Sequence, residues 1–152
     1  MFKFLSLRGK ILLILKGLSG MFKIIEKPQR ELEANISLLK VLAENSFDSI
    51  LVTDASQEGK IIYANTAFNK LTGYKPSEVL GKTPRILQGN ATDKMVIDRL
   101  SNCLATGKKF EGKAINYKKN RTPFIMHWRV LPIKTRNNIE AWVAIQRGCS
   151  HL

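Results

Sequence analysis

The chain has 152 residues with a formal net charge of +13, and 44% of its residues are hydrophobic. This composition suits one packed domain of ordinary size plus an extension, and it excludes a compositionally disordered chain. The two cysteines, Cys103 and Cys149, belong to no CxxC or Cys/His spacing. No metal-binding or disulfide framework is therefore predicted, and a reduced, cytoplasmic setting is expected.

The positive charge is spread along the whole chain and is not gathered into one patch with interleaved aromatic residues. No helix-turn-helix, RRM or KH signature is present, so nucleic-acid binding is not favoured. We expect instead a solvated basic surface that favours contact with anionic lipid.

Residues 2–25 carry apolar side chains at three- and four-residue spacing, with basic side chains off that stripe. The pattern predicts a basic amphipathic helix within a first segment, residues 1–27. Its longest unbroken apolar run, residues 11–15, is too short to span a bilayer. The helix is expected either to lie peripherally at the inner face of the membrane or to pack on a partner or on the domain itself. Three glycines, Gly9, Gly17 and Gly20, weaken it in either case.

Pro28 marks a break, and residues 28–46 form a second segment. Its apolar positions predict a helix over residues 29–45 that leads into the following domain; they are Leu32, Ile36, Leu39 and Leu42. We call it the leading helix.

From Phe47 the hydrophobic period changes, and a domain is predicted over residues 47–148, with a tail at 149–152. Strands are predicted at residues 49–54, 60–64, 110–118, 122–134 and 139–147, and helices at residues 65–71, 76–80 and 93–106. Asn65 is expected to cap the first of these helices. The expected inward face of the last helix consists of Met95, Val96, Leu100, Cys103 and Leu104.

Residues 81–89 read Gly-Lys-Thr-Pro-Arg-Ile-Leu-Gln-Gly, and residues 65–74 precede them with Asn-Thr-Ala-Phe-Asn-Lys-Leu-Thr-Gly-Tyr. Together they resemble the flavin-contacting segment of a PAS sensor domain of the light-oxygen-voltage (LOV) type. The resemblance covers about residues 42–147. It implies an α+β PAS fold, in which a five-stranded antiparallel sheet carries short helices on one face, here preceded by N-terminal helices.

The resemblance also implies a flavin pocket. Arg85 would meet the flavin phosphate, which the arginine fork suits, and Gln88 would meet the ribityl chain. Asn116 matches the strand asparagine that bonds the pyrimidine edge of the ring, where an amide can both donate and accept. Gln146 matches the last-strand glutamine near flavin N5 and O4, which relays the flavin state to the sheet and flanking helices. Thr83 and Met126 complete the candidate cofactor-binding residues.

Three positions depart from the LOV pattern. Pro84 stands where the reactive cysteine belongs, and proline has neither a thiolate nor a backbone N–H. Met126 replaces a second amide, and Ser101 replaces a second phosphate-binding arginine. The run Thr83-Pro84-Arg85 is closer to the Asn-Pro-Arg of FAD-binding redox PAS domains. The expected cofactor is therefore FMN or FAD, with an empty pocket or another small ligand as the alternative.

Each candidate residue also has a purely structural interpretation. In an empty pocket Asn116 and Gln146 could satisfy each other, and Arg85 could pair with Asp93 or Asp98. Haem is disfavoured, because the strand alternation that turns Met126 and Trp128 inward turns His127 outward.

The sequence has no phosphate-cradling loop, no kinase or cyclase signature and no Ser/His/Asp order, so no enzymatic activity is predicted. The expected function is a sensory, signal-transducing module that binds a flavin and responds to redox state or light without a cysteine adduct. It would act on a downstream signalling protein in trans or be a piece of a longer receptor, and it could form a homodimer. The alternative is a cofactor-free PAS dimerisation or protein-interaction module, held at the membrane by residues 2–25.

Overall fold

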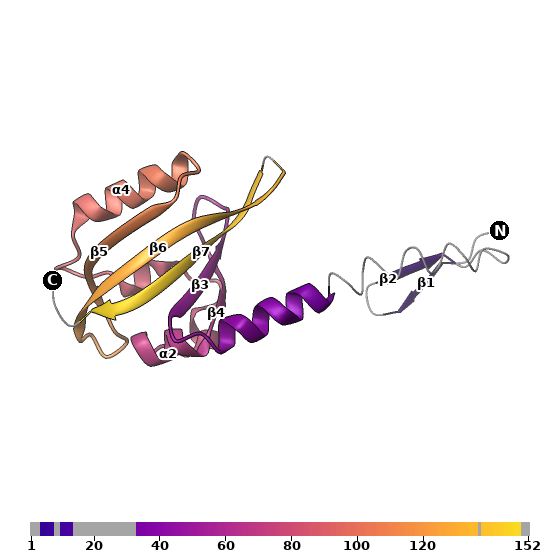
Figure 1. Cartoon of the computed structure of the whole chain (residues 1–152), viewed down its shortest axis with the longest axis horizontal. Coiled ribbons are helices and arrows are strands. Elements are labelled where there is room, and N and C mark those ends of the chain that lie inside the picture. The colour runs from indigo at the N-terminus through magenta and orange to yellow at the C-terminus, as the bar shows by residue number, and fades with distance from the viewer. Residues whose placement is uncertain (1–3, 8–9, 14–32, 137, 150–152) are drawn as a thin grey trace. The chain divides into compact units, whose positions relative to one another are not determined.

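The computed structural model describes residues 4–7, 10–13, 33–136 and 138–149 (Figure 1). The chain divides into two compact units, residues 1–40 and residues 41–152. Among the described residues, no helix is both long and apolar enough to cross a bilayer.

The first unit contains a two-stranded antiparallel ladder. β1 (Phe4–Leu7) pairs with β2 (Lys10–Leu13), with Phe4 opposite Leu13. The helix predicted over residues 2–25 is therefore wrong for these two stretches, and the rest of it lies outside the described residues. Short apolar runs near a glycine fit a strand as well as a helix, because four residues carry too little periodicity to distinguish the two.

Residues 33–44 form one helix, which confirms that part of the predicted leading helix; residues 29–32 lie outside the described residues. Its large apolar side chains are well exposed, each between 57% and 65%: Ile36, Leu38, Leu39, Val41 and Leu42. An apolar face of this kind is unusual for a helix that meets only water.

The second unit is built on a five-stranded antiparallel sheet with the strand order β4-β3-β7-β6-β5, as predicted for a PAS fold. The strands are β3 (Ser49–Asp54), β4 (Ile61–Ala64), β5 (Phe110–Tyr117), β6 (Pro123–Thr135) and β7 (Asn138–Cys149). The three C-terminal strands form a meander, and β7 then pairs with β3. The first and last strands of the domain therefore lie side by side in the middle of the sheet.

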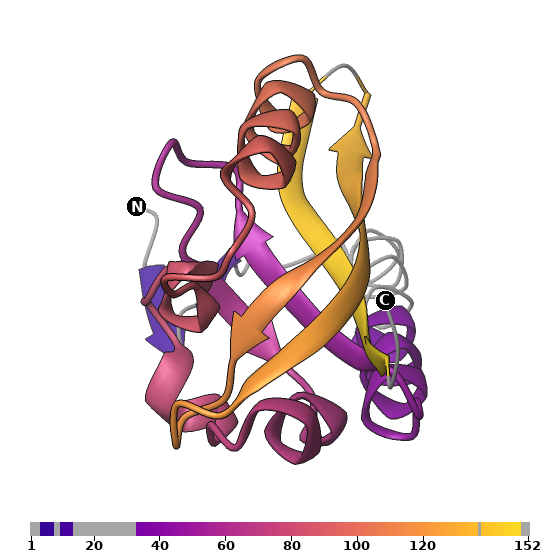
Figure 2. The ribbon, with the colours of Figure 1, turned by 90° about the vertical axis from the view of Figure 1, so that its left-hand side faces the viewer.

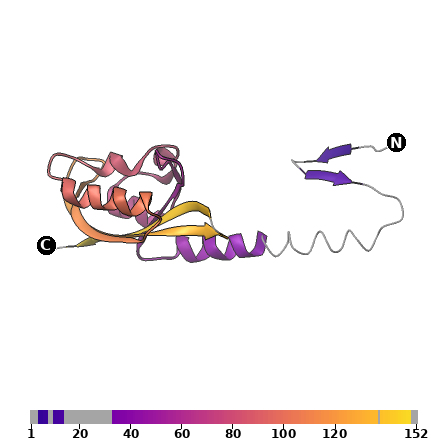
Figure 3. The same cartoon turned by 90° about the horizontal axis from the view of Figure 1, so that it is seen from above.

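Between β4 and β5 the chain forms four helices on one side of the sheet (Figures 2 and 3). They are α2 (Thr66–Thr72), α3 (Pro76–Val79), the 3-10 helix η1 (Pro84–Leu87) and α4 (Lys94–Ala105). The predicted cap is present, because Asn65 accepts from the Phe68 N–H; at the start of α4, Asp93 likewise accepts from the Met95 N–H. Gly73 ends α2 with φ +79°, a left-handed conformation that glycine adopts without strain.

Two hydrophobic clusters fill the space between the sheet and these helices. The first joins β3 and β4 to the short helices and contains Leu51, Ile61, Ala64, Phe68, Val79 and Leu87. The second lies on β5, β6 and β7 and contains Phe110, Ala114, Met126, Trp128, Val130 and Trp142. Val96, Leu100, Cys103 and Leu104 of α4 pack against the second cluster, as predicted. Met95 is 81% exposed, so its predicted inward orientation is wrong: it precedes the apolar stripe by one position, about 100° around the helix.

Asn65 joins three elements through one fully buried side chain. Its Oδ1 accepts hydrogen bonds from the Ile50 N–H at 2.9 Å and the Phe68 N–H at 3.0 Å. Its Nδ2 donates to the carbonyl oxygens of Ala43 at 2.8 Å and Asp48 at 3.0 Å. The end of the leading helix, the start of β3 and the start of α2 are therefore held by a single amide.

Glu44 adds a second connection between the leading helix and α2. Its carboxylate accepts from the Tyr63 hydroxyl at 2.7 Å, and from the backbone N–H and hydroxyl of Thr66 at 3.1 and 2.9 Å. Burial first, and then the bond to Glu44, raises the pKa of Tyr63 to about 12. The phenol therefore stays protonated and remains a donor throughout the physiological pH range.

Replacing Asn65 by Asp should remove the Nδ2 donor while keeping an acceptor of the same shape. The carbonyls of Ala43 and Asp48 would then face a carboxylate, and we expect the free energy of unfolding to fall by about 2–4 kcal/mol. Urea unfolding followed by circular dichroism measures this. The control is Asn102→Asp, because Asn102 is exposed on α4 and its side chain makes no hydrogen bond among the described residues. Equal losses in the two variants would contradict the role of Asn65.

Candidate functional site

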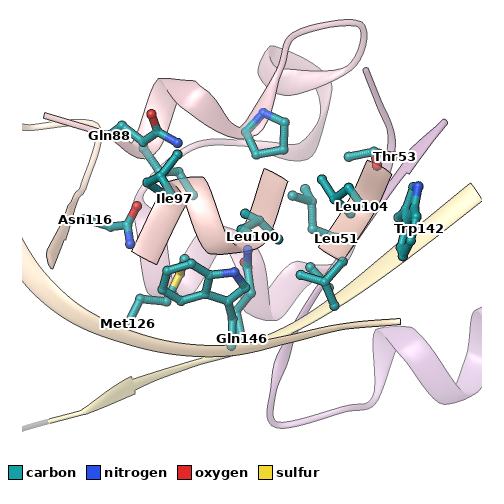
Figure 4. A pocket seen from close by; sticks show the side chains of 15 residues that line it. Leu51, Thr53, Gln88, Ile97, Leu100, Leu104, Asn116, Met126, Trp142 and Gln146 are labelled. Carbon is teal, nitrogen blue, oxygen red and sulfur yellow. The ribbon is translucent and has the colours of Figure 1, made fainter. Parts of the chain in front are cut away.

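A cavity lies between the two hydrophobic clusters, under α4 (Figure 4). Its volume is 90 Å³, which is smaller than the roughly 300–1,000 Å³ of most ligand pockets. Apolar side chains from both clusters form most of its wall. The polar side chains on the wall are three amides and one hydroxyl, from Gln88, Asn116, Gln146 and Thr53. Gln88 and Asn116 lie at one end, and Thr53 and Trp142 lie at the other.

Asn116 is the most informative residue of this cavity. It lies on β5 and is 3% exposed, and its Nδ2 is buried without a hydrogen-bond partner. A buried amide donor that lacks a partner costs about 1–3 kcal/mol. The expectation that Asn116 and Gln146 satisfy each other is therefore wrong, and the free donor faces the cavity.

Gln146 lies on β7 and is also 3% exposed. Its Oε1 accepts a hydrogen bond of 2.9 Å from the hydroxyl of Ser49, the first residue of β3. Ser49 and Gln146 are register partners in the β3–β7 ladder. The side chain of Gln146 therefore lines the cavity and also contacts the first residue of β3.

The remaining candidate residues divide into two groups. Pro84 and Met126 line the cavity together with Gln88, and Met126 is 4% exposed. Thr83 and Arg85 are not part of its wall: Thr83 precedes η1, and Arg85 is exposed on it. Among the described residues Arg85 makes no ion pair with Asp93 or Asp98, contrary to the structural alternative.

The outer face of the sheet carries His127, as the strand alternation predicts, while Met126 and Trp128 turn inward. His127 Nε2 lies 2.9 Å from one oxygen of Glu111, and Arg129 donates to the other oxygen at 3.1 Å. The hydrogen bond to His127, followed by that to Arg129, holds the pKa of Glu111 below its usual value. His127 is therefore engaged outside the cavity, which does not suit a haem ligand.

Asp48 and Arg147 form a two-pronged ion pair beside the cavity glutamine. Arg147 Nε and a terminal nitrogen donate to the two carboxylate oxygens of Asp48 at 2.7 and 2.8 Å. Because Ser49–Gln146 and Asp48–Arg147 are consecutive pairs, β7 is linked both to the first residue of β3 and to the loop that follows the leading helix.

Two features of the site were missed by sequence reasoning. Ile97, Leu100 and Leu104 of α4 form part of the wall, and the helical period that placed α4 over the core already contained that information. The bond between Ser49 and Gln146 could not be inferred, because it depends on the register between strands 97 residues apart.

Residues 48–147 match the family model described as a PAS domain. The chain therefore belongs to the PAS domain family.

Its relatives include a plant phototropin and a bacterial blue-light-activated histidine kinase. The chain is 36% identical over 111 residues to Phototropin-1B of Oryza sativa, which covers 72% of this chain and 11% of that protein. It is 39% identical over 80 residues to a blue-light-activated histidine kinase of Brucella anthropi, which covers 53% of this chain and 16% of the kinase. The match thus spans only a small part of either relative.

Solved LOV domains have the same fold. A light-oxygen-voltage domain studied with a flavin analogue is 28% identical, with a TM-score of 0.69, over 75% of this chain and 85% of that one. The LOV domain of the blue-light-activated histidine kinase of Erythrobacter litoralis is 29% identical, with a TM-score of 0.64, over 66% of this chain and 94% of that one. The resemblance to LOV domains inferred from residues 65–89 is confirmed.

The Asp48–Arg147 pair predicts a pH dependence of stability. The hydrogen bond from Arg147 is the main cause that holds the pKa of Asp48 below its ordinary value, against the opposing effect of partial burial. A depressed carboxyl pKa contributes stability above the unfolded-state value, and this is lost as pH falls through the folded-state value. The stability advantage of the parent chain over Asp48→Asn should therefore shrink between about pH 5 and about pH 2. Thermal unfolding of both proteins across this range measures it; an advantage independent of pH would contradict the assignment.

Proposed function

We propose that this chain is a sensory PAS module that binds a flavin, FMN or FAD, in the cavity under α4. It would transmit a change in flavin redox state or excitation without forming a cysteine adduct. The observation that carries the proposal is the buried, unpartnered Nδ2 of Asn116, which faces a cavity that Gln88 and Gln146 also line. The similarity to LOV domains supports the same conclusion.

The residues present fit the polar edge of a flavin ring. That edge offers carbonyl acceptors on either side of an N–H donor, and Asn116 has a free donor for one of the acceptors. The amide of Gln146 can donate or accept, depending on which way it turns. When bound, a flavin supplies absorption of blue light and reversible uptake of electrons. Pro84 offers no thiol on the cavity wall, so the response must run through hydrogen bonding.

Uptake of a three-ring system requires the cavity to widen, and α4 is the wall best suited to move. It contributes Ile97, Leu100 and Leu104 to the lining, and none of its residues is fully buried. The opposite wall consists of hydrogen-bonded strands that carry buried tryptophans. Outward displacement of α4 therefore costs less packing than distortion of the sheet.

The proposed signal path begins at Gln146. A change in hydrogen-bond demand at the ring would turn its amide, which now accepts from Ser49. Ser49 follows Asp48, whose carbonyl is bonded to Asn65, and Asn65 also holds the end of the leading helix at Ala43. The expected output is thus a change at the leading helix, read by a downstream signalling protein or by an output domain. No catalytic role is proposed for the domain itself.

The decisive experiment is an absorption spectrum of the freshly purified protein, with any cofactor released by heat and identified. A structured blue band that bleaches under dithionite is expected, and illumination should produce no thiol-adduct spectrum. A colourless protein that takes up neither FMN nor FAD would overturn the flavin proposal.

Replacing Asn116 by Ala should weaken flavin binding by about tenfold or more, because the donor that faces the ring is lost. Fluorescence titration with FMN measures the affinity. Asn138→Ala is the matched control, since Asn138 is exposed at the start of β7, away from the cavity wall. Unchanged affinity in Asn116→Ala would remove the observation on which the proposal rests.

A cofactor-free interaction module is the second candidate function. It is favoured by the five exposed apolar side chains of residues 36–42, which suit a homodimer or another protein partner. Light scattering of the parent chain and of a variant with Leu39 and Leu42 replaced by Gln distinguishes the cases. A dimer that dissociates on substitution, in a protein that binds no flavin, would support this alternative.

We further propose that residues 1–25 attach the protein peripherally to an anionic membrane surface at its cytoplasmic side. This stretch holds five basic residues and no acidic ones: Lys3, Arg8, Lys10, Lys16 and Lys23. Replacing the five by Gln should reduce sedimentation with anionic vesicles, and added salt should reduce it for the parent chain. Deleting residues 1–25 should abolish it while leaving flavin binding intact. Vesicle binding that survives the deletion would disprove the attachment.

A further inference from the structure

α4 covers the cavity and lies alongside β5 (Figure 1). Its two ends are fixed by hydrogen bonds. Before its start, the Thr92 hydroxyl donates to the Ile115 carbonyl of β5 at 2.8 Å. After its end, the Lys108 N–H donates to the Cys103 carbonyl at 2.8 Å, and Gly107 has φ +66°, a pattern that closes a helix before the chain turns into β5. The helix between these ends needs its own attachment to the sheet.

Within the described part of the chain, Arg99 is the one residue of α4 whose side chain hydrogen-bonds to a strand. Its Nη2 donates to the Glu111 carbonyl of β5 at 3.0 Å. Ser101 also has a bonded side chain, but it donates to the Ile97 carbonyl of its own helix. The side chains of α4 that pack on the second hydrophobic cluster are apolar and only partly buried. Without Arg99, these partial contacts alone would hold the middle of α4 on the sheet.

The guanidinium of Arg99 occupies a defined place on β5. Its Cζ lies 5.1 Å from the centroid of the Phe110 ring, within the range of cation–π attraction. Gly112 leaves the space for this contact, because a Cβ there would lie 2.5 Å from Phe110 Cζ and 3.0 Å from Arg99 Nη2. Phe110 is 3% exposed, and its ring centroid lies 5.5 Å from that of Trp128, which lines the cavity. Two aromatic rings thus connect the exposed guanidinium to the cavity.

We propose that Arg99 is a latch that holds α4 closed over the cavity, and that its release admits the ligand. The bond to Glu111 and the contact with Phe110 are both made by an exposed side chain. Water can therefore replace them when α4 lifts, and this opening costs far less than unfolding the sheet. Arg99 is a positioning residue, because it acts on α4 and is not part of the cavity wall. The admission of a ligand rests on the proposed flavin function, whereas the opening of α4 does not.

Cys103 reports the opening of α4 without any ligand. It lies on α4 and packs, partly buried, against the second hydrophobic cluster, so lifting of α4 exposes its thiol. Alkylation of the full chain is followed by peptide mass spectrometry, with Cys149 at the end of β7 as the internal reference. Arg99→Met keeps an apolar stem over the Phe110 ring and removes the donor. Cys103 should then react about three- to tenfold faster, while the rate at Cys149 stays the same.

Arg121→Met is the matched control for the latch. Arg121 Cζ lies 5.5 Å from the centroid of the Tyr117 ring, and its side chain makes no hydrogen bond among the described residues. Low concentrations of urea separate the opening of α4 from unfolding of the domain, since a local opening exposes little surface and depends weakly on urea. The latch is disproved by an unchanged Cys103 rate in Arg99→Met, by an equal gain in the control, or by a gain with a steep urea dependence.

Stopped-flow mixing of the full chain with FMN tests whether the latch admits the ligand. Uptake of FMN should be faster in Arg99→Met by about the same three- to tenfold, because both measurements depend on the same opening. If Cys103 reacts faster while FMN uptake is unchanged, the ligand enters by another route and the admitting role is wrong. A chain that takes up no flavin overturns the proposed function and the admitting role together. The Cys103 rate then still decides whether Arg99 holds α4.

Discussion

The described part of the domain depends on one buried amide. Asn65 uses all four of its hydrogen-bonding positions on backbone groups of the leading helix, the loop before β3, β3 itself and α2. A carboxylate could not donate to Ala43 and Asp48, and a hydroxyl has too few positions. Asparagine or glutamine alone has the required donors and acceptors, and only the shorter side chain also caps α2 by accepting from the residue three positions on. The attachment of Ala43, at the end of the leading helix, to the start of the first strand follows from this choice.

The same region connects the cavity under α4 to the rest of the domain. Ser49 contacts Gln146 on the buried face of the sheet, and Asp48 pairs with Arg147 on the exposed face. The two links alternate between faces because successive residues of a strand point to opposite sides. A disturbance at Gln146 therefore reaches the loop before β3 without crossing the hydrophobic clusters, which would resist rearrangement.

Local patterns in the sequence were sufficient to predict the helices and strands of the domain. They were insufficient to predict which side chains pair with one another. The alternation of residues 110–147 predicted all three C-terminal strands and the outward position of His127, because one face of an antiparallel sheet is buried. Asn65 was recognised as a cap because an asparagine directly before a helical pattern is a local signal. The strands at residues 4–13 were missed because runs of four residues carry no decisive period. Arg85 and Thr83 were assigned by resemblance as cofactor-binding residues; η1 leaves Arg85 exposed and Thr83 off the cavity wall, and both assignments stay predictions.

The absence of fully buried residues on α4 has a kinetic meaning. A wall held by partly buried side chains can detach at a small fraction of the free energy needed to unfold the sheet. Association and dissociation of a ligand would then share one barrier, the local opening of α4, while affinity would be set by amides on strands that stay in place. Substitutions such as Val96→Ala, which loosen α4 at a position outside the cavity wall, would accelerate exchange in both directions and leave the equilibrium constant nearly unchanged. A sensor built this way can change how fast it equilibrates with its ligand separately from how tightly it binds.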